Sequence, residues 1–217
     1  CCSPGHFFWL DSPYENREMT KVNRREQQKA NTRAKIKNAA RRAFHEFGIE
    51  ATTTREISRL SNVAVGTFFV HYADKLELVK EIYFDDMDEA LSSSVGQLPP
   101  TPSPAEYLIQ IAKILFPFYS DYIESTRHIV ADSINRGGFH TQQMQSISQG
   151  VSKRFTDAGI DTKTAQLFAE NMMANYWLVF MECLPKNEFS NSSVIERLEG
   201  LNLPFKISFE NALQTKR

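Results

Sequence analysis

Basic side chains gather in one stretch of this 217-residue chain, between residues 20 and 55. That stretch holds ten lysines and arginines against three glutamates, a net charge of +7, whereas the whole chain has a net charge of -1. Cations concentrated at one end can bind a polyanion such as nucleic acid, while an acidic remainder is repelled by it. A solvated, charged helix face is the alternative interpretation of the charge alone. The charge therefore suggests phosphate binding, and the other features of the sequence must decide between the two interpretations.

Side chains for catalysis or metal binding are not grouped in this way. Asp121, Glu124 and His128 fall at helical spacing, but without a cysteine or a second histidine at fixed spacing a solvated ion pair is the better interpretation. No nucleophile–base arrangement or glycine-rich phosphate loop stands out. We therefore expect no catalytic residue, no metal site, no cofactor and no enzymatic activity. The three cysteines show no metal-ligand spacing and indicate a reducing compartment.

The ends and the longest apolar run limit the cellular setting. The run over 172–184 is shorter than the roughly 20 residues that a membrane span needs, and residues 1–19 lack the layout of a signal peptide. A cytoplasmic chain without membrane contact is therefore expected. Residues 1–19 show no periodicity and are interpreted as a disordered extension or an expression-vector remnant. The domains are then 20–79 and 80–217.

The signals that follow the basic stretch have the order of a helix-turn-helix. Apolar residues at spacings of three and four predict a helix that Gly48 ends. Thr53-x-x-Glu56 is a capping box, in which each side chain satisfies a backbone amide at the start of the next helix. Asn62 lies where the turn needs a left-handed backbone. A second short helix follows over 65–72. The apolar stripe of the first helix is Ile36, Ala39, Ala40, Ala43, Phe44 and Phe47.

The rest of the chain also has helical periodicity, and no segment alternates strongly enough to be a strand. The predicted fold class is all-α. Pro117 is expected to kink one helix and Pro204 to interrupt the last. The further helices are expected over 76–91, 104–125, 126–135, 141–157, 161–184 and from 192 or 193 onward, with Asp74 and Asp161 as N-caps.

The ordered residues between 30 and 80 resemble the tetracycline-repressor (TetR) family of bacterial transcription regulators. The resemblance implies an N-terminal three-helix helix-turn-helix DNA-binding domain and a larger helical C-terminal domain for ligand binding and dimerisation. It also implies a homodimer, because two heads read the half-sites of a palindromic operator in double-stranded DNA. The residues that carry it are Ile36, Ala39-Ala40, Phe44, Gly48, Thr53, Glu56-Ile57, Ser58, Asn62-Val63-Ala64, Gly66-Thr67, Phe68-Phe69, His71-Tyr72 and Lys75.

Four departures from the family pattern change the expected reading of DNA. Asn62 stands for the turn glycine, Ala64 for the serine N-cap, Phe69 for the tyrosine that reaches a phosphate, and Val65 for a basic residue. The recognition helix therefore carries no Arg, Lys, Asn or Gln. Hydrogen bonds to base edges are then limited to Thr67 and His71, whereas apolar side chains can contact thymine methyl groups.

Other expected contacts surround that helix. Arg55 is the candidate for guanine, and Arg24 and Arg25 form an arm that could enter an A·T-rich minor groove. Lys75 matches the family's phosphate-binding lysine. The operator is expected to be partly A·T-rich. The full set of expected DNA-contacting residues is Arg24, Arg25, Thr53, Arg55, Val65, Gly66, Thr67, Phe69, Val70, His71 and Lys75.

Aromatic and methionine side chains are dense in the C-terminal region. They could line an adaptable apolar pocket or simply form core, and the spacing leaves both open. The two last helices are expected to pair with their symmetry mates in the dimer. The candidate ligand-binding residues are Phe116, Tyr119, Tyr122, Met173, Tyr176, Trp177 and Phe180.

Together these expectations describe a bacterial cytoplasmic regulator that is associated with the nucleoid when bound to DNA. The expected activity is repression, released by a small and largely apolar effector. Two alternatives stay open: an activator or global regulator without a small-molecule inducer, and a helical protein-interaction module that retains the fold.

Overall fold

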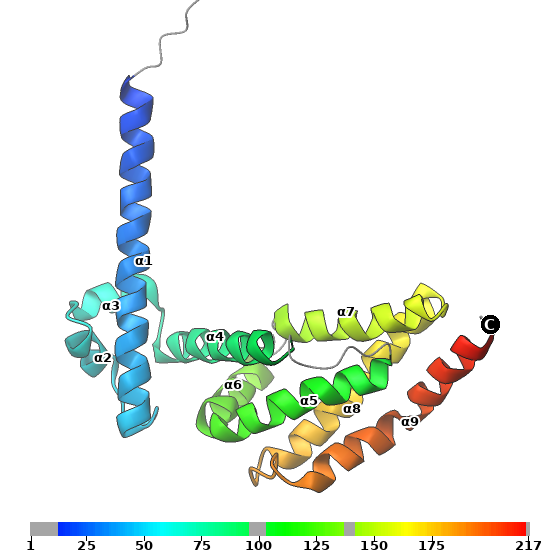
Figure 1. Ribbon diagram of the computed structural model, residues 1–217. Helices are drawn as coiled ribbons and strands as arrows, with labels where there is room; N and C mark the ends of the chain where they lie inside the picture. Colours follow the sequence, from blue (N-terminus) through cyan, green and yellow to red (C-terminus); the bar gives the residue numbers. More distant parts are fainter. Residues whose placement is uncertain (1–12, 96–102, 137–141, 216–217) are drawn as a thin grey trace, which may run out of the picture. The chain divides into compact units, whose positions relative to one another are not determined.

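The computed structural model describes residues 13–95, 103–136 and 142–215, and every regular element in these ranges is an α-helix. The predicted all-α fold class is confirmed (Figure 1). Residues 1–12, part of the predicted N-terminal extension, lie outside the described residues. The helices are α1 (Pro13–Phe47), α2 (Thr54–Leu60), α3 (Val65–His71), α4 (Lys75–Val95), α5 (Pro104–Asp121), α6 (Ile123–Arg136), α7 (Gln142–Asp157), α8 (Thr162–Cys183) and α9 (Ser192–Thr215).

The chain divides into two compact units, Cys1–Lys75 and Leu76–Arg217. This division lies four residues before the predicted domain boundary at 79/80. It falls in the first turn of α4, which is continuous from Lys75 onward.

The first unit contains α1, α2 and α3. Figure 1 shows α2 and α3 beside the C-terminal half of α1, whose N-terminal half extends past them. Alanines on α1 leave little side-chain volume, so the three helices can approach closely. Ile57 of α2 and Phe68 of α3 are fully buried. The buried apolar residues of this unit are Ile36, Ala39, Ala40, Ala43, Ile49, Ile57, Phe68 and Tyr72.

Two features of α1 differ from expectation. Residues 13–19, interpreted as part of a disordered extension or an expression-vector remnant, are helical and continuous with the rest of α1. No glycine or proline follows Pro13 before Gly48, and a proline in the first helical turn removes no hydrogen bond. Phe47, placed on the apolar stripe, is the last residue of α1 and is 52% exposed.

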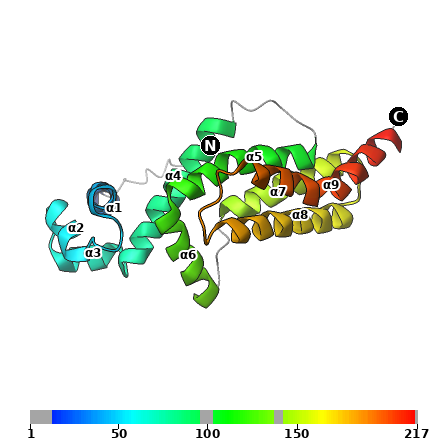
Figure 2. The same ribbon diagram turned by 90° about the horizontal axis from the view of Figure 1, so that it is seen from below.

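The second unit has its core among α5, α7, α8 and α9, and α4 and α6 also contribute to it. Figure 2 shows α8 and α9 running alongside each other. Asp161 caps α8 as predicted, since its carboxylate accepts a 3.1 Å hydrogen bond from the Thr164 amide. No helix in the described part of the chain is long and apolar enough to cross a membrane.

Two prolines are accommodated inside helices. Pro117 lies within α5, which ends at Asp121 rather than continuing to Ser125. Pro204 lies within α9 and does not interrupt it, contrary to expectation. Both prolines are exposed, so the carbonyl four residues earlier, which proline leaves without a backbone donor, can be hydrated.

Candidate nucleic-acid interface

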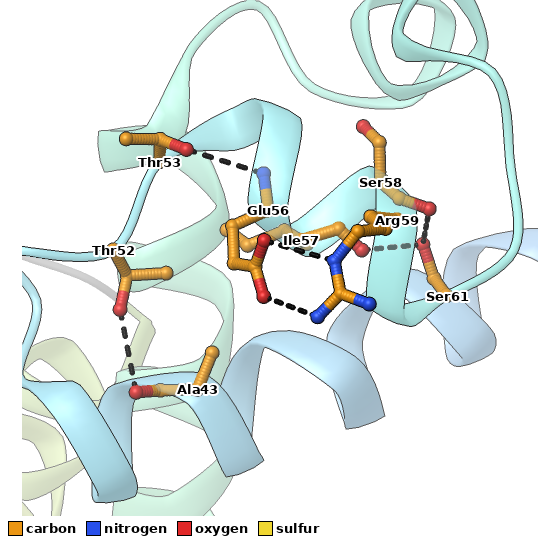
Figure 3. Close-up of polar contacts among 8 residues, drawn as sticks. All are labelled: Ala43, Thr52, Thr53, Glu56, Ile57, Ser58, Arg59 and Ser61. Atoms are coloured by element: carbon orange, nitrogen blue, oxygen red, sulfur yellow. Dashed lines mark hydrogen bonds and ion pairs between the residues drawn. The ribbon is translucent and has the colours of Figure 1, made fainter.

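The start of α2 is capped, but the predicted capping box is only half formed (Figure 3). The Thr53 hydroxyl accepts a 3.1 Å hydrogen bond from the Glu56 amide. The Glu56 carboxylate instead accepts hydrogen bonds of 2.7 and 3.1 Å from the Arg59 guanidinium. These bonds lower the pKa of the Glu56 carboxyl. The acidic residue thus stabilises the exposed side of α2 by an ion pair between neighbouring turns.

The turn between α2 and α3 has the predicted geometry. Asn62 has φ 54°, the left-handed conformation that the sequence requires of it. The Ser61 hydroxyl donates to the Ile57 carbonyl at 2.7 Å, and the Val63 amide donates to the Ser58 carbonyl at 3.0 Å. Ala64 makes no side-chain cap on α3. Backbone hydrogen bonds and the serine therefore hold the second helix at a defined angle to the first.

The loop between α1 and α2 is held by a threonine and a lysine. The Thr52 hydroxyl donates to the Gly48 carbonyl at 2.7 Å. It also donates to the Ala43 carbonyl at 3.3 Å (Figure 3). The Lys75 ammonium donates to the carbonyls of Ile49 at 2.6 Å and Thr52 at 2.9 Å, with the carbonyl of Glu50 at 3.4 Å.

The Lys75 ammonium thus has a structural role within its own domain. It donates to three carbonyls, so a phosphate oxygen would have to displace one of them. Lys75 positions the loop that leads into α2, and the phosphate contact expected of it stays a prediction.

The solvent-facing side of α3 is uncharged and mostly apolar. Val65, Phe69 and Val70 are 39%, 51% and 73% exposed. A Cβ atom added at Gly66 would meet no other atom within 4 Å, so this position is open as well. Thr67 is half-buried at the edge of the same face. Phe68 and Tyr72 are buried, so one side of α3 packs into the domain and the other is open to solvent.

His71 lies between this face and α1. It is half-buried, and burial, then the charges of Arg33 and Lys29, lower the pKa of its imidazole. The Arg33 guanidinium donates to the His71 carbonyl at 3.0 Å and lies 4.5 Å from the centre of the Tyr72 ring. His71 therefore lies close to basic side chains of α1, and its expected base contact stays a prediction.

The expected arginine contacts are exposed. Arg55 lies in the first turn of α2, and Arg24 and Arg25 lie on α1. The latter two belong to the continuous helix α1, so the arm expected to carry them is helical. Lys29 and Arg33 of the same helix were not singled out from the sequence. Their position near His71 depends on how α1 packs against α3.

Most of the candidate ligand-binding residues lie in the core of the second unit. The hydroxyls of Tyr119 and Tyr176 lie 3.0 Å apart, and the ring of Phe116 is 5.3 Å from that of Tyr176. The Phe180 ring contacts Tyr119 edge-on at 4.9 Å. Tyr122 is 37% exposed. Buried in that core are Phe116, Tyr119, Met173, Tyr176 and Phe180, with Trp177 partly buried beside them.

Two cavities in the second unit lie elsewhere, and none of the seven candidate residues lines either of them. One, of about 300 Å³, is lined by α4, α5 and α7. The other, of about 650 Å³, is an open groove between α5 and α9. Sequence patterns missed both because isolated polar and apolar residues from distant helices line them. The smaller cavity is lined by Asp88, Leu91, Tyr107, Ile111, Gln143, Ser146 and Ile147.

Metal binding finds no support in the part of the chain that the structure describes. No group of three or more histidine, cysteine, aspartate or glutamate side chains lies close enough to hold an ion there.

Comparisons with known proteins agree with this geometry. Residues 36–82 match the family model of bacterial regulatory proteins of the tetR family. ArpR of Pseudomonas putida, described as a probable HTH-type transcriptional regulator, is 32% identical over 96 residues, 42% of this chain and 45% of ArpR. The HTH-type transcriptional regulator TtgR, also of Pseudomonas putida, is 38% identical over 61 residues, 28% of this chain and 29% of TtgR. The chain thus spans less than half the length of these relatives.

Solved structures extend the likeness to both units as a fold. A TetR-family transcriptional regulator from Mesorhizobium loti MAFF303099 has a TM-score of 0.56 at 19% identity, covering 82% of this chain and 96% of that one. GusR of Salmonella enterica has a TM-score of 0.50 at 21% identity, covering 85% of this chain and 96% of that one. The match over residues 36–82 agrees with the family resemblance of the N-terminal domain, and the solved structures show the same fold for the larger part of the chain.

Proposed function

We propose that this chain, whose N-terminal domain is that of the TetR family, is a sequence-specific DNA-binding transcriptional regulator. In this proposal it acts as a homodimer on a palindromic operator, and a small effector releases it. The observation that carries the proposal is the open face of α3, held at a defined angle by the Asn62 turn. A helix presented in this way can enter the major groove.

The chemistry of that face suggests which bases it reads. Val65 and Val70 are exposed and can contact thymine methyl groups. Thr67 adds a methyl group and a hydroxyl at the edge. Exposed Arg55 is the candidate for a guanine, because arginine can donate two hydrogen bonds to its major-groove edge. We therefore infer an operator that is partly A·T-rich, with Thr53, Gly66 and Phe69 close to the sugar-phosphate backbone.

Apolar side chains on α8 and α9 support a homodimer. Leu167, Leu178 and Met181 of α8 are between 46% and 48% exposed, and Leu203 and Ile207 of α9 are 52% and 48% exposed. Such residues at helical spacing on two adjacent helices form a stripe that a second copy can cover. A two-fold dimer also presents two heads to two half-sites.

The two helices that carry this stripe are joined by hydrogen bonds. The Asn175 side chain on α8 donates to the Leu201 carbonyl and the Asn202 side-chain oxygen on α9, each at 3.1 Å. These bonds fix α8 and α9 against each other where the stripe is proposed.

The cavity lined by α4, α5 and α7 is our candidate effector site. Leu91, Ile111 and Ile147 supply apolar surface, and Asp88 and Gln143 supply polar groups that are hydrogen-bonded to each other at 2.7 Å. Its volume of about 300 Å³ lies at the lower end for small-ligand sites. Because α4 is continuous to Lys75, an effector that prefers one position of α4 would change the population of the DNA-binding state.

Selection from a pool of random duplexes tests the function. The full chain is expected to enrich a palindrome that is partly A·T-rich. Val70→Glu should abolish the enrichment, because it places an anion on the open face of α3 without disturbing packing. Ile134→Glu is the matched control, since Ile134 is also 73% exposed but lies on α6.

The two alternatives to a ligand-released repressor predict different results. Failure of the folded, dimeric protein to enrich any sequence would favour a protein-interaction module. Enrichment that no small molecule ever reverses would favour an activator or global regulator. True phosphate binding must also weaken steeply with added salt.

A further inference from the structure

We propose that α1 itself binds the DNA backbone beside the recognition helix, through a basic ridge formed by Arg25, Lys29 and Arg33. The inference rests on the proposed DNA-binding function. It concerns α1 rather than the recognition helix, and it assigns to this helix a surface that follows phosphates, where the sequence suggested an arm in the minor groove.

The ridge follows from helix geometry. Residues four apart lie on the same side of an α-helix, so Arg25, Lys29 and Arg33 form one row along α1. Residues 24–31 are all exposed, and Figure 1 shows this half of α1 extending past α2 and α3. A row of charges on a rigid helix loses less conformational freedom on binding than a flexible arm does.

One end of the ridge is anchored at the recognition helix. Arg33 donates to the carbonyl of His71, the last residue of α3, and covers the Tyr72 ring. Lys29 is near enough to lower the pKa of the His71 imidazole, together with burial and Arg33. The ridge therefore begins where α3 ends and leads away from it along α1. Phosphates at the edge of the groove that holds α3 would lie within its reach.

Charge and composition favour DNA over a protein on this surface. Residues 24–33 carry a net charge of +3, with Glu26 as the sole acidic residue, and contain no large apolar side chain. Protein interfaces need apolar or aromatic anchors that this segment does not offer. From Arg25 to Arg33 the helix rises about 12 Å, which matches roughly three to four base pairs of duplex.

The test compares two duplexes that carry the selected operator. One ends at the outer edges of the half-sites, and the other continues for about six base pairs on each side. The full chain is compared with Arg25→Gln/Lys29→Gln, which removes two charges from the ridge and leaves the anchored Arg33. The matched control is Lys163→Gln/Lys186→Gln, which removes two exposed charges from the second unit.

We expect the unchanged chain and the control to bind the longer duplex at least tenfold more tightly. The ridge variant should lose this gain and bind both duplexes alike. The ridge variant loses two phosphate contacts per head, so its binding should also depend less on salt. A tenfold rise in salt weakens binding by roughly 60-fold for every two phosphate contacts.

The remaining outcomes overturn the inference in distinguishable ways. The unchanged chain and the ridge variant could each bind the two duplexes equally tightly. This result would refute phosphate binding by the ridge and leave the proposed function intact. If the ridge variant still bound the longer duplex more tightly by the full factor, residues other than the ridge would contact the flanking DNA. This result would also refute phosphate binding by the ridge. No binding of either duplex by the unchanged, folded chain would refute the proposed function together with the ridge.

Discussion

The Lys75 ammonium donates a 2.6 Å hydrogen bond to the carbonyl of Ile49, which precedes it by 26 positions in the chain. The bond ties the first residue of α4 to the loop between α1 and α2. A second bond to the carbonyl of Thr52, at 2.9 Å, holds the same loop just before the cap of α2. Lys75 therefore stabilises the DNA-binding unit from within.

Lys75→Met tests this structural role, because methionine keeps most of the side chain but removes the donors. The carbonyls of two buried residues, Ile49 and Thr52, lose their charged partner. Loss of such bonds should cost about 1–3 kcal/mol of unfolding free energy. Hydrogen exchange over 49–53 should also accelerate. The control, Lys35→Met at an exposed position of α1, should change neither the unfolding free energy nor the exchange rate. If Lys75→Met weakened DNA binding but left hydrogen exchange unchanged, the result would support phosphate binding by Lys75 instead.

The Tyr119–Tyr176 pair predicts non-additive substitutions. Both hydroxyls are fully buried, 3.0 Å apart. Tyr176→Phe leaves the Tyr119 hydroxyl without this partner and should cost about 1–3 kcal/mol. The double change to phenylalanine should cost less than the sum of the single changes, because no polar atom then remains stranded. Urea unfolding measures the cycle, and strictly additive values would contradict the coupling.

This pair and a third buried tyrosine, Tyr83, predict a loss of stability at alkaline pH. Burial raises the pKa of Tyr83, Tyr119 and Tyr176 above the ordinary value near 10. Above about pH 10 the unfolded chain therefore releases protons that the folded chain retains, and stability falls as pH rises. Each such tyrosine contributes about 1.4 kcal/mol per pH unit to the slope. Tyr83→Phe should reduce the slope measured by urea unfolding between about pH 9 and 11.

Substitution of Gly150 is expected to disturb the packing of α7 against α5. A Cβ atom there would lie 2.7 Å from the Tyr107 hydroxyl oxygen, and the Arg154 guanidinium, 3.8 Å from the ring centre, covers the Tyr107 ring. Gly150→Ala should therefore destabilise the second unit by about 1–3 kcal/mol despite the better helix propensity of alanine. Tyr107→Leu in the same chain should recover part of the loss in thermal unfolding. A stabilised Gly150→Ala protein would show that the ring moves freely.

The proposed dimer face predicts dissociation by a single charge. Leu178→Glu places a carboxylate at the middle of the apolar stripe on α8, where a symmetric partner would bury it uncompensated. The dimer dissociation constant should rise about a hundredfold or more, as measured by analytical ultracentrifugation. Ile134→Glu, on α6, should leave the dimer unchanged. Equal dissociation in both variants would place the interface elsewhere.

Local signals in the sequence determined the helix-turn-helix. Gly48, the Thr53 cap and Asn62 act through backbone geometry within a few residues, so their effect is independent of distant packing. The same holds for the helical class of the chain and for the Asp161 cap. The family resemblance rests on these residues, and its confirmation by residues 36–82 follows from them.

Tertiary structure alone decided which side chains are available for binding. Nothing near Lys75 in the sequence indicates that its ammonium meets the carbonyls of Ile49 and Thr52, because those atoms come from another part of the chain. The aromatic cluster around Tyr119 and Tyr176 is equally consistent with a pocket or a core until the helices pack. Whether a polar or apolar side chain is free to bind depends on the atoms that surround it, and these are brought together by contacts between distant segments.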